Sequence, residues 1–204
     1  MLQITVHPNK RIQVGAPPEL TEAKIETLVR KKASWILGKL ALVTDQLPEE
    51  PKELLNGEKI LYLGRRYKIQ WSDVTEPSFK AGFYLLPQTI PRAKVVEDFK
   101  KRAQHVFTER LKFIKANTGV AAEGFKVVEQ KARWGSCDKY GQLRINWKII
   151  MAPKLIIDYV LCHELAHLKI QDHSPKFWKL VEEMNPKYEE HREWLRKNGP
   201  ILDL

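Results

Sequence analysis

The sequence predicts an α+β protein with a β-rich N-terminal region at residues 1–90 and a second domain at residues 91–204. In the second domain we expect a helix beside a small antiparallel sheet. Short alternating apolar runs separated by turn residues dominate the first region, and a long helical pattern follows Pro91. The third observation is an apolar run at residues 155–170 that contains the motif HExxH. A chain of 204 residues is long enough for one large or two small domains.

The N-terminal region begins with a predicted β-hairpin. Residues 2–6 and 11–14 alternate in polarity and flank the turn sequence His-Pro-Asn-Lys. A helix with apolar residues at helical spacing then follows at residues 21–43, and the prolines at residues 48–51 interrupt the pattern. This region therefore contains one predicted helix.

Three further short strands are predicted before residue 90. Asn56-Gly57 is a strong turn signal. Residues 60–63 and 67–71 form a predicted hairpin around Gly-Arg-Arg, and residues 83–86 form one more strand. These strands account for the β-rich character of the first region.

The second domain begins with a predicted helix at residues 92–116, which ends before Gly119. Residues 124–130 and 143–150 are predicted strands of a hairpin, and residues 138–141 supply its turn. The second strand leads directly into the HExxH helix.

The HExxH motif at residues 163–167 is the strongest chemical signal. In a helix, His163 and His167 lie one turn apart on the same face, so both imidazoles can bind a single Zn²⁺. Glu164 is not at a ligand spacing and lies where a general base would act on a water activated by the metal. The apolar flanks argue against two solvated histidines, because buried histidines need a partner.

His173 is the predicted third metal ligand. Along one continuous helix its side chain would point roughly 240° away from that of His167. We therefore expect the helix to end near residue 170 and the chain to fold back. Ser174 and Pro175 predict the start of a second helix that runs to residue 184. The weaker candidates for the third ligand, which also fit a solvated helix face, are Glu182 and Glu183. The histidines without a partner at ligand spacing are His7, His105 and His191.

Two segments together resemble a known family. RWGSC at residues 133–137 and HELAHLKIQDHSPKFW at residues 163–178 are similar to the YgjP-like metallopeptidases, which are related to the WLM and SprT-like zincins. The resemblance covers about residues 125–198. It implies a zincin-like catalytic core and a zinc-dependent hydrolase with one zinc ion per chain. It assigns His163, His167 and His173 as the zinc ligands and Glu164 as the catalytic base. In zincins an edge strand beside the metal helix holds an extended peptide, and we expect the predicted hairpin to do so.

The RWGSC segment has two interpretations. Arg133 and Ser136 could contact an anionic or carbonyl oxygen near the metal and stabilise the transition state. Equally, Trp134 and Gly135 could pack beneath the metal helix while Arg133 pairs with a structural carboxylate.

The charge of the chain also bears on its partners. Lys and Arg number 35 against 25 Asp and Glu, a net charge of +10. Such an excess favours an anionic partner such as a nucleotide or nucleic acid, although it also fits a solvated basic surface. Residues 1–15 lack the apolar core of a signal peptide, and no apolar run is long enough to span a bilayer. We therefore expect a cytoplasmic protein without a membrane partner.

Three functional hypotheses follow. The first is a zinc metallopeptidase that acts on a peptide or protein substrate through a metal-activated water and Glu164. The second is a metal-dependent nucleotide phosphoanhydride hydrolase or pyrophosphatase, although the phosphate-binding motif GxxxxGK[ST] is absent. The third is a non-catalytic zinc-containing module that binds nucleic acid or protein. Structural zinc sites usually have four protein ligands, which argues against the third.

Overall fold

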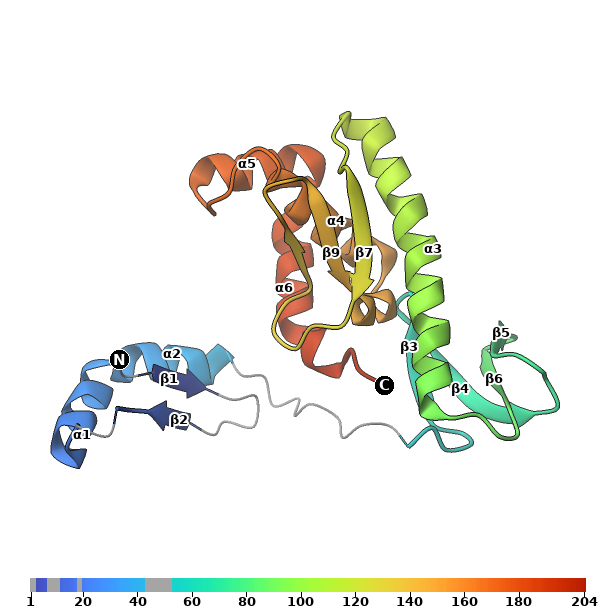
Figure 1. Ribbon diagram of the computed structural model, residues 1–204, viewed down its shortest axis with the longest axis horizontal. Coiled ribbons are helices and arrows are strands. Elements are labelled where there is room, and N and C mark those ends of the chain that lie inside the picture. The colour runs from blue at the N-terminus through green and yellow to red at the C-terminus, as the bar shows by residue number, and fades with distance from the viewer. Residues whose placement is uncertain (1–2, 7–11, 18–19, 43–52) are drawn as a thin grey trace. The chain divides into compact units, whose positions relative to one another are not determined.

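The computed structural model describes residues 3–6, 12–17, 20–42 and 53–204 of a mixed α+β protein (Figure 1). The chain divides into two compact units, Met1–Glu50 and Pro51–Leu204, called unit 1 and unit 2 below. The sequence predicts a domain boundary after residue 90, whereas the two compact units divide between residues 50 and 51. The reason is that the strands between residues 59 and 87 belong to unit 2.

Unit 1 contains the predicted hairpin, with β1 (Gln3–Val6) antiparallel to β2 (Ile12–Gly15). The turn between them and the prolines at residues 48–51 lie outside the described residues. The prediction of one helix at residues 21–43 was wrong, because α1 (Glu22–Lys31) and α2 (Ala33–Leu42) are separated at Lys32. A continuous helix of this length would span about 35 Å. The break lets α2 turn and contact β1.

Unit 2 begins with a four-stranded sheet in the order β3-β4-β6-β5. The predicted hairpin of β3 (Lys59–Tyr62) and β4 (Arg65–Ser72) is confirmed, and Asn56-Gly57 forms a turn before β3. Strand β6 (Phe83–Pro87) pairs parallel with β4, and its other neighbour is β5 (Ser78–Lys80), which was not predicted.

A close contact fixes this sheet to the rest of unit 2. At the β3–β4 turn, the N–H groups of Leu63 and Gly64 donate to the carbonyls of Ile150 and Met151, both at 2.9 Å. Gly64 has φ +78°, and a Cβ there would lie 2.7 Å from Cγ of Pro153. The sheet is thus joined to the segment that precedes the HExxH helix, which explains why the compact unit begins before β3.

The predicted long helix is confirmed as α3 (Arg92–Thr118), which ends at Gly119 in the left-handed conformation with φ 72°. It buries one face of apolar residues at intervals of about one turn. The buried residues of α3 are Val95, Phe99, Ala103, Phe107 and Ile114.

The second sheet has three strands, β7 (Gly124–Val128), β8 (Gly135–Cys137) and β9 (Gln142–Asn146), in the order β7-β9-β8. The prediction that the first and last strands form an antiparallel hairpin was wrong, since β7 and β9 are parallel. The segment between them is long enough to supply β8, which pairs antiparallel with β9 through the predicted turn. The predicted second strand also stops early, because Trp147–Met151 forms a 3₁₀ helix, η1.

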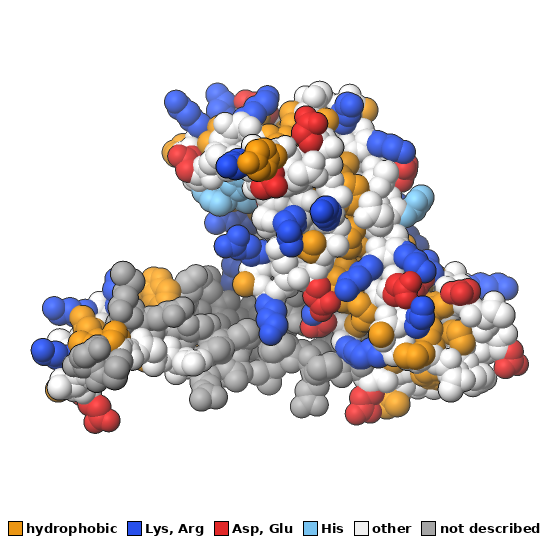
Figure 2. All heavy atoms as spheres, in the orientation of Figure 1, with side chains coloured by type: hydrophobic (Ala, Val, Ile, Leu, Met, Phe, Trp, Pro, Cys, Tyr) orange, Lys and Arg blue, Asp and Glu red, His pale blue; other side chains and the backbone are white. Residues whose placement is uncertain are grey.

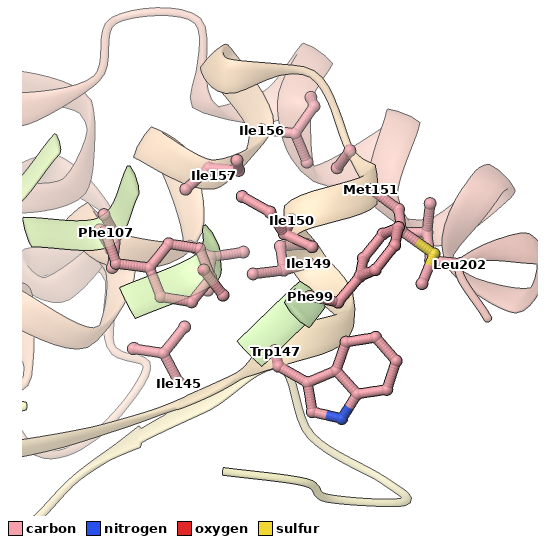
Figure 3. Packing of buried hydrophobic residues seen from close by; sticks show 14 of the residues in the cluster. Phe99, Phe107, Ile145, Trp147, Ile149, Ile150, Met151, Ile156, Ile157 and Leu202 are labelled. Atoms are coloured by element: carbon pink, nitrogen blue, oxygen red, sulfur yellow. The ribbon is translucent and has the colours of Figure 1, made fainter. Parts of the chain in front are cut away.

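The C-terminal part contains α4 (Lys154–Ala166), α5 (Pro175–Met184), α6 (Tyr188–Asn198) and the short 3₁₀ helix η2 (Gly199–Ile201). The core lies where α3, η1 and α4 meet, as Figure 3 shows for Phe99 and Phe107 of α3 beside Trp147 and Ile150 of η1. Within the described ranges, the structure contains no helix long and apolar enough to cross a membrane.

Candidate metal centre

Three histidines converge in unit 2. His163 lies on α4, and His167 directly follows the last residue of this helix. His173 lies in the loop before α5. One nitrogen from each imidazole lies within 4.8 Å of the other two. The Nε2 atoms of His163 and His173 are 3.1 Å apart. Pale-blue histidine side chains reach the surface beside α5 in Figure 2. This group can therefore hold one metal ion, and with Glu164 it is called the metal centre below.

The local sequence explains how His173 reaches the other two histidines. Helix α4 ends at Ala166, and the imidazole Nδ1 of His167 lies 3.0 Å from the carbonyl of Ile170. The chain then turns, and the backbone N–H of Ser174 donates to the Asp172 carboxylate at 3.1 Å. Ser174 precedes the first residue of α5, as predicted from the Ser-Pro pair. The helix thus ends four residues before the predicted end near residue 170, and the expected turn before His173 is confirmed.

The nitrogens of the three histidines suit a metal. The contact with Ile170 occupies Nδ1 of His167 and leaves its Nε2 available. Burial, aided by the neighbouring His167 and His173, lowers the pKa of His163 to about 3. Burial also lowers the pKa of His167. Both imidazoles are therefore neutral near pH 7, the form that binds a metal.

Aromatic side chains surround the histidines. The ring of Phe177 on α5 stacks on His167 with 4.5 Å between centroids, and Phe177 has no exposed surface. Trp178 lies 5.6 Å from His163 and stacks on Tyr188 of α6. Nδ1 of His163 is buried and has no hydrogen-bond partner among the residues that the structure describes. This apolar enclosure restricts the orientation of the rings.

Glu164 is buried beside the three histidines, with 6% of its surface exposed. Burial raises its pKa to about 7, and the positive charge of Arg133 opposes that rise. The side chain lies against Gly135 of β8, where a Cβ would be 2.7 Å from Cγ and 2.8 Å from Oε1 of Glu164. A glycine at this position is therefore what lets the strand approach the carboxyl group.

A cavity of about 600 Å³ opens at the metal centre. Arg133 and Ser136, which the sequence proposes as substrate contacts, both line it. Sequence reasoning missed Tyr159, which also lines the cavity and whose ring centroid is 6.1 Å from that of His163. Its position one helical turn before His163 is the signal that could have found it. Burial raises the pKa of Tyr159 to about 12, so its hydroxyl stays protonated.

The structure agrees with each interpretation of RWGSC in part, because Arg133 and Ser136 line the cavity and Gly135 lies against Glu164 of the metal helix. A Cβ at Gly199 would lie 3.1 Å from the ring of Trp134, so Trp134 packs on the end of α6. Arg133 is exposed and forms no ion pair with the residues described. The expected pairing of Arg133 with a structural carboxylate is therefore not seen within those residues.

The other candidate ligands lie apart from the metal centre. Glu182 and Glu183 are exposed on α5, and neither belongs to the group of possible metal ligands. His105 is exposed on α3, and Nδ1 of His191 contacts the amide oxygen of Asn185 at 2.8 Å. His7 lies outside the described residues.

Comparison with known proteins identifies similar chains. The model of a family described as YgjP-like, metallopeptidase domain, matches residues 1–198. Among solved structures, the crystal structure of the metallopeptidase zymogen of Pyrococcus abyssi abylysin matches at 23% identity and a TM-score of 0.38. That match covers 53% of this chain and 99% of the other. No curated protein matches the chain. The family match includes every residue of the metal centre.

Proposed function

The chain belongs to the YgjP-like metallopeptidase family, and from this premise we propose that it is a zinc-dependent peptidase whose active site is the metal centre. Family membership supports a metal-dependent, peptidase-like enzyme. The observation that carries the finer proposal is the approach of three imidazole nitrogens to within 4.8 Å beside a buried carboxyl group. We also propose a zincin-like catalytic core, with α4 as its metal helix and β8 as the strand beside it.

In this proposal His163, His167 and His173 hold one zinc ion per chain. Imidazole is a common zinc ligand, and three protein ligands are typical of catalytic zinc, whereas structural zinc usually has four. The described part of the chain offers three donors in this group, which favours an enzyme over the non-catalytic module. When bound, zinc supplies Lewis acidity that polarises a carbonyl group and makes water more acidic.

Glu164 is the proposed general base. Its carboxylate accepts a proton from the attacking water and then donates that proton to the amine that leaves. In the metal-free protein burial raises the pKa of Glu164 to about 7, so the group can gain and lose a proton near neutral pH. Burial is the main cause of that pKa, so the environment of Glu164 is matched to the proposed role.

The proposed substrate is an extended peptide that adds to β8. This strand pairs with β9 on one side, is an edge of its sheet, and contacts α4. Backbone groups along the other side of β8 can therefore pair with a peptide while Gly135 keeps the strand close to Glu164. Arg133 and Ser136 are the proposed contacts for the carbonyl oxygen, because both line the cavity.

A second candidate function is hydrolysis of a nucleotide phosphoanhydride. Arg133 favours it, since a guanidinium group without an ion pair in the described residues can bind phosphate. Nucleoside triphosphates assayed beside peptides separate the two functions. Turnover of triphosphates with none of peptides would replace the peptidase proposal.

The test of the proposed function combines metal content with peptide turnover. Elemental analysis of protein purified without chelator should give about one zinc per chain, with metal lost or weakened in His173→Ala. Glu164→Gln should keep zinc and lose turnover, because the amide cannot accept a proton. His105→Ala, at an exposed position on α3, is the matched control and should resemble wild type. No zinc in wild type, or full activity in Glu164→Gln, would reject the proposal.

A further inference from the structure

A second cavity adjoins the metal centre in unit 2. Its volume is about 570 Å³, and it shares Ala132, Arg133, Trp134 and Leu195 with the cavity at the metal centre. The ring of Trp134 packs on Gly199, and Trp134 lines both spaces. A substrate that occupies the first cavity can therefore extend into the second, which is called the basic cavity below.

The basic cavity carries an excess of positive charge. Its charged lining residues are Glu129, Lys131, Arg133, Lys148, Arg196 and Asp203. Both carboxylates are already paired, because Asp203 contacts Lys148 at 2.6 Å and Glu129 contacts Lys100 at 3.3 Å. Lys131 and Arg133, in contrast, form no ion pair with any residue that the structure describes. These two cations can therefore attract an anionic group of a ligand.

A buried asparagine orients the loop that carries both cations. Asn146 has 3% of its surface exposed, and its amide nitrogen donates to the carbonyls of Gln130 at 2.7 Å and Arg133 at 3.1 Å. Its backbone N–H donates to the carbonyl of Trp134 at 2.8 Å. The backbone on both sides of Lys131 is thus held in place, which reduces the entropy lost when the loop binds a ligand.

The position of the basic cavity along β8 defines which part of a peptide reaches it. If Glu164 is the general base, the reacting bond lies near Gly135, because Glu164 lies against this residue. The basic cavity is lined by residues 129–134, which precede Gly135 in the chain. A peptide antiparallel to β8 would direct its C-terminal side toward these residues.

We propose that the basic cavity is a substrate subsite for a carboxylate on the C-terminal side of the scissile bond, read by Lys131 and Arg133. The carboxylate belongs to an Asp or Glu side chain or to the end of the peptide. This inference rests on the proposed peptidase function. It predicts a preference for acidic peptides that the metal centre by itself does not require.

The test measures peptide binding without turnover. Zinc-loaded Glu164→Gln protein is titrated with fluorescent peptides of one sequence that carry Asp, Asn or Lys after the scissile bond, each with a free or an amidated end. The Asp peptide or the free end should bind about three- to tenfold tighter than its neutral counterpart. Introducing Lys131→Glu into the Glu164→Gln protein should remove or invert that preference. Adding Lys126→Glu, the same charge change on β7 outside both cavities, should leave it intact.

Two outcomes would overturn the inference. These are equal affinity for acidic and neutral peptides, and a preference unchanged by Lys131→Glu. Wild-type turnover of the same peptides is measured in parallel. Cleavage without acidic preference rejects the subsite and leaves the peptidase proposal, whereas the absence of any cleavage rejects the peptidase proposal and the subsite with it, even if acidic peptides bind. A triphosphate that displaces the acidic peptide and is itself hydrolysed would assign the cavity to nucleotides.

Discussion

At the residue scale, burial of Glu164 raises the pKa of its carboxyl group and lowers the stability of the metal-free protein at neutral pH. The folded, metal-free protein binds a proton at Glu164 more tightly than the unfolded chain does, because burial raises the pKa of this carboxyl group from 4.5 to about 7. Because the pKa is raised on folding, the contribution of Glu164 to the free energy of unfolding is most favourable at low pH. That contribution is lost as the pH rises from 4.5 to about 7. Above pH 7 the folded, metal-free protein therefore contains a buried Glu164 carboxylate, whose charge is poorly solvated and destabilises the fold.

The first prediction concerns this cost. In metal-free protein, Glu164→Gln should match wild type near pH 4.5 and become more stable at pH 8, by on the order of 1–3 kcal/mol. Urea denaturation with chelator at both pH values measures the difference. Glu76→Gln, at an exposed position of unit 2, serves as the control and should show no such change. A difference that does not grow with pH would contradict the prediction.

The second prediction concerns the glycine that faces Glu164. In Gly135→Ala the new Cβ would lie within 2.9 Å of Cγ, Cδ and Oε1 of the buried glutamate. The carboxyl group must shift, so we expect kcat to fall about tenfold or more while zinc content is unchanged. Kinetics and elemental analysis together test this. Gly124→Ala on β7 is the matched control, since its Cβ would meet only the mobile amide end of Gln142.

At the element scale, a partly buried ion pair joins α3 to the metal helix. Arg110 of α3 donates to both carboxylate oxygens of Asp158 on α4, at 2.6 and 2.7 Å. Asp158 has 7% of its surface exposed and lies five residues before the first histidine of the motif. The pair thus fixes the long helix against the element that carries the metal centre.

The third prediction is that Arg110→Ala destabilises unit 2 by about 2–4 kcal/mol, because it leaves the Asp158 carboxylate buried without its partner. Lys112→Ala removes the exposed pair with Glu109 on the same helix and should change stability by about 0–1 kcal/mol. Chemical denaturation of both variants measures the contrast. Equal effects would show that the partly buried pair contributes little.

Elements whose ends are marked by local chemistry follow the sequence closely. Helix α5 begins at Pro175 after Ser174, and α3 ends before a glycine with positive φ, both as predicted. The break between α1 and α2 at Lys32 has no glycine or proline to mark it. After the break α2 contacts β1, and this contact depends on residues distant in the chain.

At the scale of the whole molecule, the buried core is concentrated in unit 2. Among the described residues, Ile36 is the one buried apolar side chain of unit 1. The other buried apolar side chains lie between Leu54 and Leu204 and form one cluster that surrounds the start of α4. Unit 2 therefore contains both the core and every residue of the metal centre.

The fourth prediction is that a fragment of residues 51–204 folds without unit 1. Because it retains the whole core cluster, it should unfold cooperatively and bind about one zinc per chain, as the full chain is expected to do. Thermal denaturation and elemental analysis of the fragment beside the full chain test this. An aggregated fragment, or one that loses metal when the full chain keeps it, would show that unit 2 needs unit 1.

The local features of this protein can be predicted from neighbouring residues in the chain. Helical periodicity puts His163 and His167 on one face, and the Ser-Pro pair predicts the turn that brings His173 back toward them. These features depend on residues close together in the chain, so pattern and spacing are enough to predict them.

The surroundings of those residues depend on long-range packing. The parallel pairing of β7 with β9, the contact of Gly135 with Glu164 and the basic cavity each join segments distant in sequence. Strand pairing depends on which edges remain available once the other elements have packed, and a cavity depends on how several loops meet. No local pattern encodes either, because both follow from long-range packing.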